Sequence, residues 1–79
     1  MATLDRIKNV CVELLKIDGS RVQESSRFVE DLGADSMQSI ELVASFEEEF
    51  DIEMDEDAAL GVKTVSDAVA FIDRVISEG

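Results

Sequence analysis

Ser36 is the residue whose type and position allow the most specific chemistry. It follows Asp35 at the start of an apolar-patterned stretch, which predicts a helix beginning at Asp35-Ser36 with Gln38 placed to complete a capping box. A hydroxyl at the start of a helix is exposed, and the macrodipole and free backbone N–H groups there favour a phosphate. Taken alone, a serine beside an aspartate is typical of capping, so covalent attachment of a group to Ser36 is the alternative interpretation.

Ser36 is not expected to act as a catalytic nucleophile. The surrounding segment reads Gly33-Ala34-Asp35-Ser36-Met37 rather than G-x-S-x-G, and the chain contains no histidine to serve as a base. Paired carboxylates could carry out acid/base chemistry, but a small domain with an open acidic face offers no obvious enclosed substrate cavity. We therefore expect no catalytic residues and no enzyme activity.

The only cysteine, Cys11, cannot form an intramolecular disulfide or a thiolate zinc site. It lies on the apolar stripe of a predicted helix, which favours a packed thiol over a reactive one.

The acidic residues are concentrated in one part of the chain. There are 7 Lys and Arg against 19 Asp and Glu, giving a net charge of −12, and no basic residue lies between Arg27 and Lys63. Twelve acidic residues fall in that interval, and the 7 acids outside it balance the 7 bases. Such a run is commonly a solvated face, but it also opposes compaction and attracts cationic partners.

The same stretch does not contain a specific calcium loop. A twelve-residue EF-hand frame starting at Asp51 puts Glu56 where the turn needs glycine and Val62 where the bidentate glutamate belongs. No metal site is predicted, although loose binding of divalent cations to such dense charge is plausible.

Length and composition predict a single domain over residues 1–79. The negative charge argues against nucleic acid and anionic membrane surfaces as partners. No apolar run approaches the roughly 18 residues of a membrane span, and the N-terminus lacks the apolar stretch of a signal peptide. We expect a cytoplasmic monomer.

Apolar residues recur at helical spacing, which predicts an all-α fold: a small four-helix bundle of three longer helices and one short helix. The first helix is predicted from an N-cap at Thr3 to near Lys16, with Asp18-Gly19 as the stop signal. A long first loop follows, over about residues 17–35. Four apolar residues could pin this loop to the core: Val22, Phe28, Val29 and Leu32.

Two further helices are predicted, one inside the acidic interval and one after it. A short third helix is predicted from about Asp55 to Leu60, closed by Gly61. The last helix opens near Thr64, where Asp67 completes a T-x-x-D capping box.

The second helix carries apolar residues on two sides of a helical wheel. One side is predicted to face the core and contains Leu42, Val43, Phe46 and Phe50 together with Ser39. Met37, Ile40 and Ala44 lie near the opposite side, flanked by Glu41 and Glu48. Scattered apolar surface residues are common, but apolar anchors inside an acidic rim are also typical of a docking surface.

Three segments together resemble the acyl carrier proteins. They are Asp31-Leu32-Gly33-Ala34-Asp35-Ser36-Met37, then Ile40-Glu41-Leu42-Val43, then Glu47-Glu48-Glu49-Phe50-Asp51-Ile52. The family pattern is a loop ending in G-x-D-S-L followed by a helix reading roughly V-E-L-V…EEEF. The resemblance covers nearly the whole chain, because Phe28 and the segment from Thr64 to Ile72 also follow it.

The resemblance implies that a carrier-protein synthase transfers phosphopantetheine from coenzyme A to the Ser36 hydroxyl, using magnesium, with Asp35 in a supporting position. The arm's terminal thiol would carry acyl groups as thioesters between acyl-processing enzymes, such as ketoacyl synthases with basic docking patches. The residues expected to contact partners are Met37, Ile40, Glu41, Ala44, Glu47 and Glu48. The residues expected to line an acyl pocket between the helices are Phe46, Ile52, Leu60, Val65 and Ala68.

Some positions depart from the family pattern. Met37 replaces the usual leucine after the serine, Gln38 replaces a commonly acidic residue, and no proline precedes the short helix. Fatty-acid biosynthesis is the pathway we expect. The alternatives are a dedicated polyketide, lipid or peptide-type pathway or, in a different class, an unmodified acidic protein-interaction module.

Overall fold

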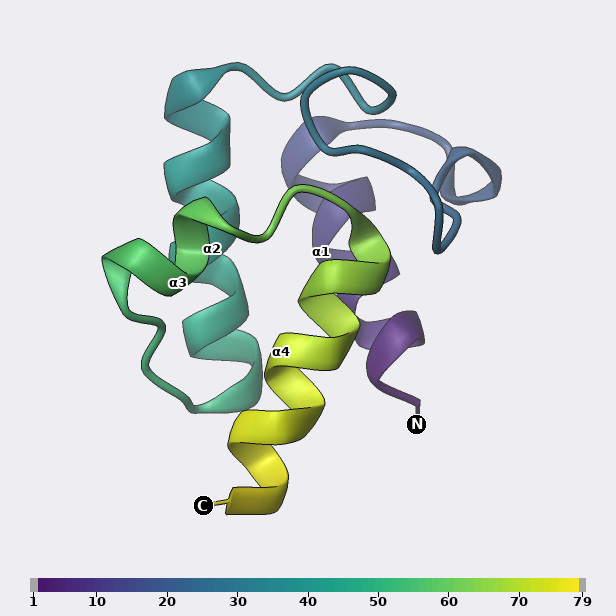
Figure 1. Cartoon of the computed structure of the whole chain (residues 1–79). Coiled ribbons are helices and arrows are strands. Elements are labelled where there is room, and N and C mark those ends of the chain that lie inside the picture. The colour runs from purple at the N-terminus through teal and green to yellow at the C-terminus, as the bar shows by residue number, and fades with distance from the viewer. Residues whose placement is uncertain (1, 79) are drawn as a thin grey trace.

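The structure, a computed structural model, describes residues 2–78 and leaves the side chain of Glu56 undescribed. Four α-helices follow one another along the chain: α1 (Thr3–Leu15), α2 (Ser36–Phe50), α3 (Glu56–Leu60) and α4 (Val65–Glu78). A short 3₁₀ turn, η1 (Gly19–Arg21), lies in the first loop. The predicted all-α bundle of three longer helices and one short helix is confirmed (Figure 1).

The start and end of α1 differ in detail from the prediction. Thr3 is the first helical residue rather than the cap, because Ala2 occupies the cap position, and the Thr3 hydroxyl donates a hydrogen bond to Asp73 on α4. The helix ends at Leu15, where Lys16 takes a left-handed conformation with φ of 56°. Asp18 caps η1 instead, accepting a hydrogen bond from the Ser20 N–H at 3.1 Å. A left-handed residue, not Asp18-Gly19, therefore ends the helix.

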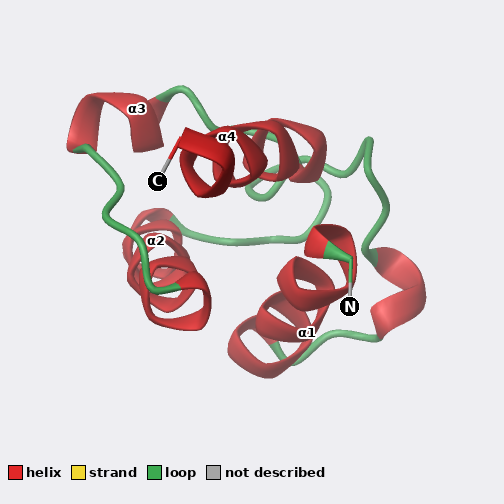
Figure 2. Cartoon of the chain, turned by 90° about the horizontal axis from the view of Figure 1, so that it is seen from below, coloured by secondary structure: helices red, strands yellow, loops and turns green. Residues whose placement is uncertain are grey.

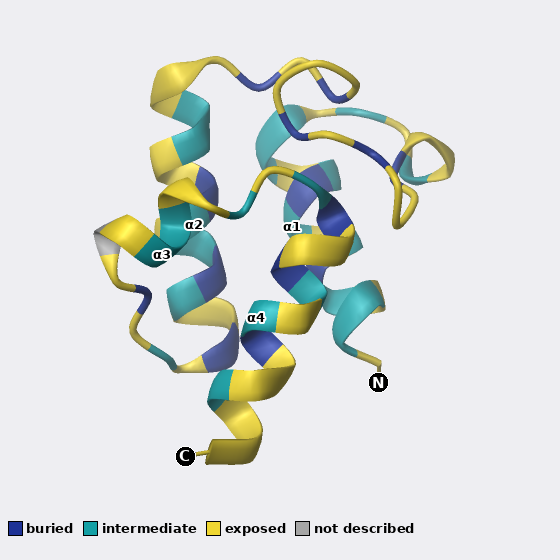
Figure 3. Cartoon of the chain, viewed as in Figure 1, coloured by how far each residue is buried: buried dark blue, intermediate teal, exposed yellow. Residues whose placement is uncertain are grey.

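The core forms where α1 contacts both α2 and α4. Figure 2 shows the three long helices grouped around this centre, with α3 at the outside of the group. The buried residues lie on the inward faces of the helices, in the first loop and, at Met54, in the connection between α2 and α3 (Figure 3). These core residues are Ile7, Cys11, Val22, Phe28, Leu32, Ala34, Leu42, Phe46, Phe50, Met54, Val65, Ala68 and Ile72.

The first loop crosses one end of the bundle and is pinned there by apolar residues (Figure 1). Val22, Phe28 and Leu32 are buried as predicted, and the Phe28 ring lies 6.1 Å from the Phe46 ring. Val29 is 56% exposed, so the prediction that it pins the loop is wrong. Ala34 takes that role, because it is buried and its N–H donates to the Phe28 carbonyl at 2.9 Å.

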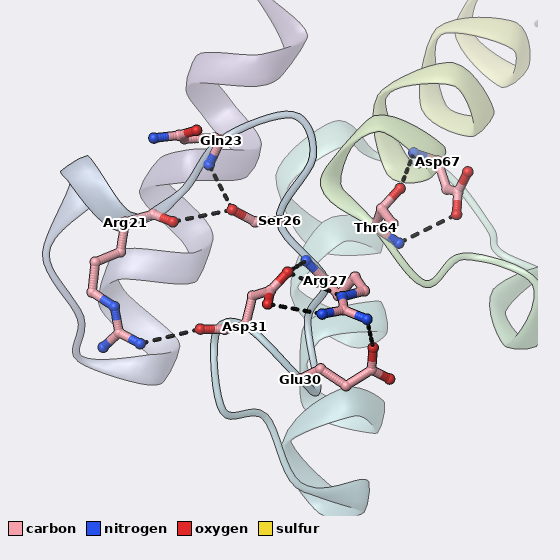
Figure 4. Close-up of polar contacts among 8 residues, drawn as sticks. All are labelled: Arg21, Gln23, Ser26, Arg27, Glu30, Asp31, Thr64 and Asp67. Carbon is pink, nitrogen blue, oxygen red and sulfur yellow. Dashed lines mark hydrogen bonds and ion pairs between the residues drawn. The ribbon is translucent and has the colours of Figure 1, made fainter.

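The loop also satisfies backbone groups at the start of α4. The N–H groups of Val65 and Ser66 each donate at 2.9 Å, the first to the Ser26 carbonyl and the second to that of Glu24. These donors have no partner inside their own helix, so the loop completes the helix terminus. The predicted capping box is confirmed, since Thr64 and Asp67 exchange side chain-to-backbone hydrogen bonds (Figure 4).

Ionic contacts hold the loop itself together (Figure 4). The Arg27 guanidinium pairs with Glu30 at 2.8 Å and with Asp31 at 3.2 Å, and Arg21 donates to the Asp31 carbonyl. Hydrogen bonds from the Arg27 side chain and backbone hold the pKa of the Asp31 carboxyl below its usual value. The buried hydroxyl of Ser26 bridges two backbone groups of the same loop.

Within the described residues, no helix is both long enough and apolar enough to cross a membrane. The Cys11 thiol is fully buried, and burial raises its pKa to about 12. The thiol therefore stays protonated at neutral pH, in agreement with the predicted packing role.

Candidate functional site

The start of α2 is held in place by the end of the first loop. Gly33 has a positive φ of 76°, a conformation that disfavours other residues, and the buried Ala34 anchors the next step of the chain. Asp35 then sits in the extended conformation required of a helix cap. The turn therefore fixes where Ser36 enters the helix.

Asp35 and Gln38 form the predicted capping box. The Asp35 carboxylate accepts the Gln38 N–H at 2.7 Å, and the Gln38 side chain accepts the Asp35 N–H at 3.1 Å. The Asp35 carbonyl accepts both the N–H and the hydroxyl of Ser39 at 2.9 Å. Asp35 thus performs the capping, and the Ser36 hydroxyl is not needed for it.

Ser36 is exposed as the first residue of α2. The first hydrogen bond inside the helix is made by the Ser39 N–H, and among the described residues the N–H groups of Ser36 and Met37 have no acceptor. Two free donors at the positive end of a helix, beside an accessible hydroxyl, suit a phosphate ester. The residues present therefore fit a phosphate-linked group at this position.

An exposed apolar surface extends along α2 from Ser36. Met37 is 69% exposed, Ile40 is 72% exposed, and Ala44 is also exposed. Glu41 and Glu48 are exposed carboxylates on the same helix. We call these five residues the α2 face. Apolar side chains this exposed contribute nothing to the core. The α2 face is therefore available for contact with other molecules.

Glu47, which the sequence analysis also expected to contact partners, has a different environment. Its side chain is half-buried, and its carboxylate accepts the N–H of Met54 at 3.0 Å. Its backbone carbonyl accepts the N–H of Ile52 at 3.1 Å. Glu47 therefore organises the turn between α2 and α3. No sequence signal pointed to this role, because Glu47 and Met54 lie seven positions apart and their hydrogen bond crosses a turn.

The five residues expected to line an acyl pocket do not share one environment. Phe46, Val65 and Ala68 are buried in the core, and Ile52 is half-buried. Leu60 is 71% exposed, which departs from the expectation that it lines an interior pocket. Met54, which the sequence analysis did not select, is buried beside the α2–α3 turn.

One hollow of about 300 Å³ lies between α3 and α4 and is lined by none of these five residues. Its lining residues are Ala58, Gly61, Val62, Asp67, Ala70, Phe71 and Arg74. Across the described side chains, no group of three or more Asp, Glu, Cys or His is placed to hold a metal ion.

Comparison with known proteins defines the class. The family described as "Phosphopantetheine attachment site" matches residues 5–72, a span that contains the whole of α2 and the loop before it. The chain is therefore a phosphopantetheine attachment domain. It is also 51% identical to the acyl carrier protein of Sulfurovum sp. (strain NBC37-1) over 75 residues, which is 95% of this chain and 100% of that protein. The chain belongs to the acyl carrier protein family, and its prosthetic group is a covalently attached phosphopantetheine.

Proposed function

We propose that Ser36 is the residue that carries the phosphopantetheine and that the protein serves fatty-acid biosynthesis. The observation that carries the proposal is the accessible Ser36 hydroxyl at the first position of α2, left free because Asp35 does the capping. Ser39 is the other hydroxyl in this turn, but its oxygen is hydrogen-bonded to the Asp35 carbonyl. The geometry thus favours Ser36 over its neighbour.

Backbone groups at the start of α2 would stabilise the attached phosphate. The free N–H groups of Ser36 and Met37, together with the helix macrodipole, would stabilise the negative charge of a phosphodiester on the Ser36 oxygen. A carrier-protein synthase, with coenzyme A as donor and magnesium, is the enzyme class that would install it. When bound, the group supplies a terminal thiol that holds acyl cargo as a thioester.

In this proposal the protein tethers and presents its cargo and is not itself a catalyst. The sequence has no histidine, and its only thiol is buried with a pKa raised by that burial. Tethering raises the effective concentration of the cargo at each enzyme that the carrier meets. The net charge of −12 opposes self-association, so we propose a monomer that works in the cytoplasm beside those enzymes.

The α2 face is the surface that we assign to partner docking. Met37, Ile40 and Ala44 supply apolar anchors, and Glu41 and Glu48 supply charge that attracts basic patches. Such patches are expected on the carrier-protein synthase and on acyl-processing enzymes such as ketoacyl synthases. Glu47 would contribute less directly, because its carboxylate is bonded to Met54.

The pathway is the finer part of the proposal. Fatty-acid biosynthesis is favoured because the segments around Ser36 and along α2 keep most of the general carrier pattern. Met37 replaces the usual leucine and is exposed next to the attachment position, so a dedicated polyketide, lipid or peptide-type pathway is the second candidate. Loading the modified protein and comparing its turnover by fatty-acid and polyketide ketosynthases would separate the two candidates.

The attachment is tested by the intact mass of the protein after incubation with coenzyme A, magnesium and a carrier-protein synthase. The wild type should gain one phosphopantetheine, and Ser36→Ala should gain none. Ser39→Ala should still gain one, because the Ser39 hydroxyl only hydrogen-bonds to the Asp35 carbonyl and is not the proposed attachment point. Modification of the Ser36→Ala variant would mean that the phosphopantetheine is attached to a different residue. No modification of any of the three by more than one synthase would favour an unmodified acidic interaction module.

A further inference from the structure

A second surface feature lies between α1 and α2. The seam where the two helices pack opens into a groove of about 410 Å³. Val10 and Leu14 of α1 and Ser45 of α2 are half-buried residues in its lining. The groove is therefore a partly apolar, open depression on the surface, which suits contact with the side chains of another protein better than enclosure of a small ligand.

The rest of the lining is acidic and is contributed by both helices. Glu13 of α1 and Glu48 of α2 are exposed, and neither forms an ion pair with a described residue. The third carboxylate, Glu49, is already bound to Arg6 at 2.9 Å, and the Arg6 guanidinium also lies 4.3 Å from the centre of the Phe50 ring. Two carboxylates beside an apolar lining thus remain without a cationic partner.

The groove is continuous with the α2 face. Glu48 belongs to both, because it borders Ala44 on the helix and also lines the groove. A protein seated on the α2 face could therefore extend a further segment over Glu48 and into the seam between α1 and α2. Docking on the α2 face rests on the proposed function, whereas the shape and charge of the groove do not.

We propose that the α1–α2 groove binds a cationic amphipathic helix of a partner protein. Apolar side chains of that helix would pack on Val10 and Leu14, and its Lys or Arg residues would pair with Glu13 and Glu48. A second copy of this chain is disfavoured as the occupant because it carries the same net charge of −12. A neutral apolar segment would leave both carboxylates without a counter-charge.

The probe is a fourteen-residue synthetic helix with leucines at i, i+3, i+4 and i+7 flanked by lysines. A scrambled peptide of the same composition and a peptide with glutamate in place of lysine are its controls. Binding to the isotopically labelled, unmodified full chain is followed by backbone amide shifts. The amphipathic lysine peptide alone should bind, with the largest shifts at Val10, Glu13, Leu14 and Ser45.

Two exposed substitutions sharpen the test without touching the core. Glu13→Gln should weaken the peptide about two- to fivefold, the effect of one exposed ion pair, and Glu24→Gln in the first loop should not. Equal binding of the scrambled peptide, shifts confined to Met37 and Ile40, or no binding at millimolar peptide would each overturn the proposal. The mass of the Ser36 adduct is measured separately, so failure of the groove and failure of the attachment are distinguishable.

Discussion

The first loop and the segment around α3 both contain little regular secondary structure, yet they are anchored to the rest of the fold by different numbers of buried side chains and hydrogen bonds. The loop buries Val22, Phe28, Leu32 and Ala34 and exchanges hydrogen bonds with the start of α4. Among the described side chains from Asp51 to Leu60, Met54 alone is buried, and the segment is tied to α2 mainly through Glu47. The acidic charge is densest in this second region. The loop that leads into Ser36 is thus firmly positioned, whereas the segment with the densest charge has fewer buried side chains to hold it.

Removing a loop anchor should produce the largest effect. Phe28→Ala is expected to lower the free energy of unfolding by about 3–5 kcal/mol, because it empties a buried site against the Phe46 ring. Urea unfolding measures the loss, and in a domain this small the variant could fail to fold at all. The adjacent Val29→Ala is the matched control and should stay within about 0.5 kcal/mol, because Val29 is exposed. Similar losses for both variants would show that the loop is not anchored through Phe28.

The helix caps in the two regions should also differ in how much they contribute to the free energy of unfolding. Asp35→Ala removes the cap of α2 and should cost about 1 kcal/mol of unfolding free energy. Asp55 occupies the equivalent position of α3 but makes no side-chain hydrogen bond there, so Asp55→Ala should stay within about 0.5 kcal/mol. Both are measured by urea titration at pH 7. A larger effect at Asp55 would reverse the comparison.

Glu47 is the side chain that links the α3 segment to α2. Glu47→Ala should weaken the α2–α3 turn by about 0.5–1 kcal/mol, because the Met54 N–H loses its acceptor. The expected signature is faster hydrogen exchange at Met54 and its neighbours, with the amides of the first loop unchanged. Glu48→Ala is the control, since the Glu48 carboxylate is exposed. Unchanged exchange at Met54 in Glu47→Ala would mean that the segment is held by other contacts.

The smallest predicted effect is a pH dependence at the start of α4. Hydrogen bonds from the N–H groups of Lys63 and Thr64 hold the pKa of the Asp67 carboxyl below its usual value. A lowered folded-state pKa stabilises the protein above the unfolded value, near 4, and the contribution is lost as the pH falls through the folded value. The stability difference between wild type and Asp67→Asn should therefore shrink from pH 6 to pH 3. A difference that grew on acidification would contradict the assignment.

Regular helical spacing made most of the fold predictable. The apolar stripes placed the three longer helices, and the capping boxes at Asp35 and Thr64 were readable because their residues lie three positions apart. The contact of Thr3 with Asp73 was not readable, since it joins residues from opposite ends of the chain. The left-handed turn at Lys16 was also missed, because glycine is the usual residue at such a position.

The candidate site was only partly predictable for a similar reason. Exposure of Met37 and Ile40 followed from their side of a long helix, whereas α3 has five residues and too little periodicity to assign a face to Leu60. The groove between α1 and α2 depends on how side chains of two helices meet, and neither helix alone contains that information.

The two described ends of the chain lie at the end of the bundle opposite to the start of α2 (Figure 1). Ser36 is separated from that end by the length of α2, which is about 22 Å for its 15 residues. A fluorophore, a surface linker or a fused enzyme joined near residue 2 or residue 78 would therefore leave the Ser36 hydroxyl open to solution. If Ser36 carries the phosphopantetheine as proposed, the fold can be immobilised or built into a larger assembly at one end without blocking the attachment position at the other.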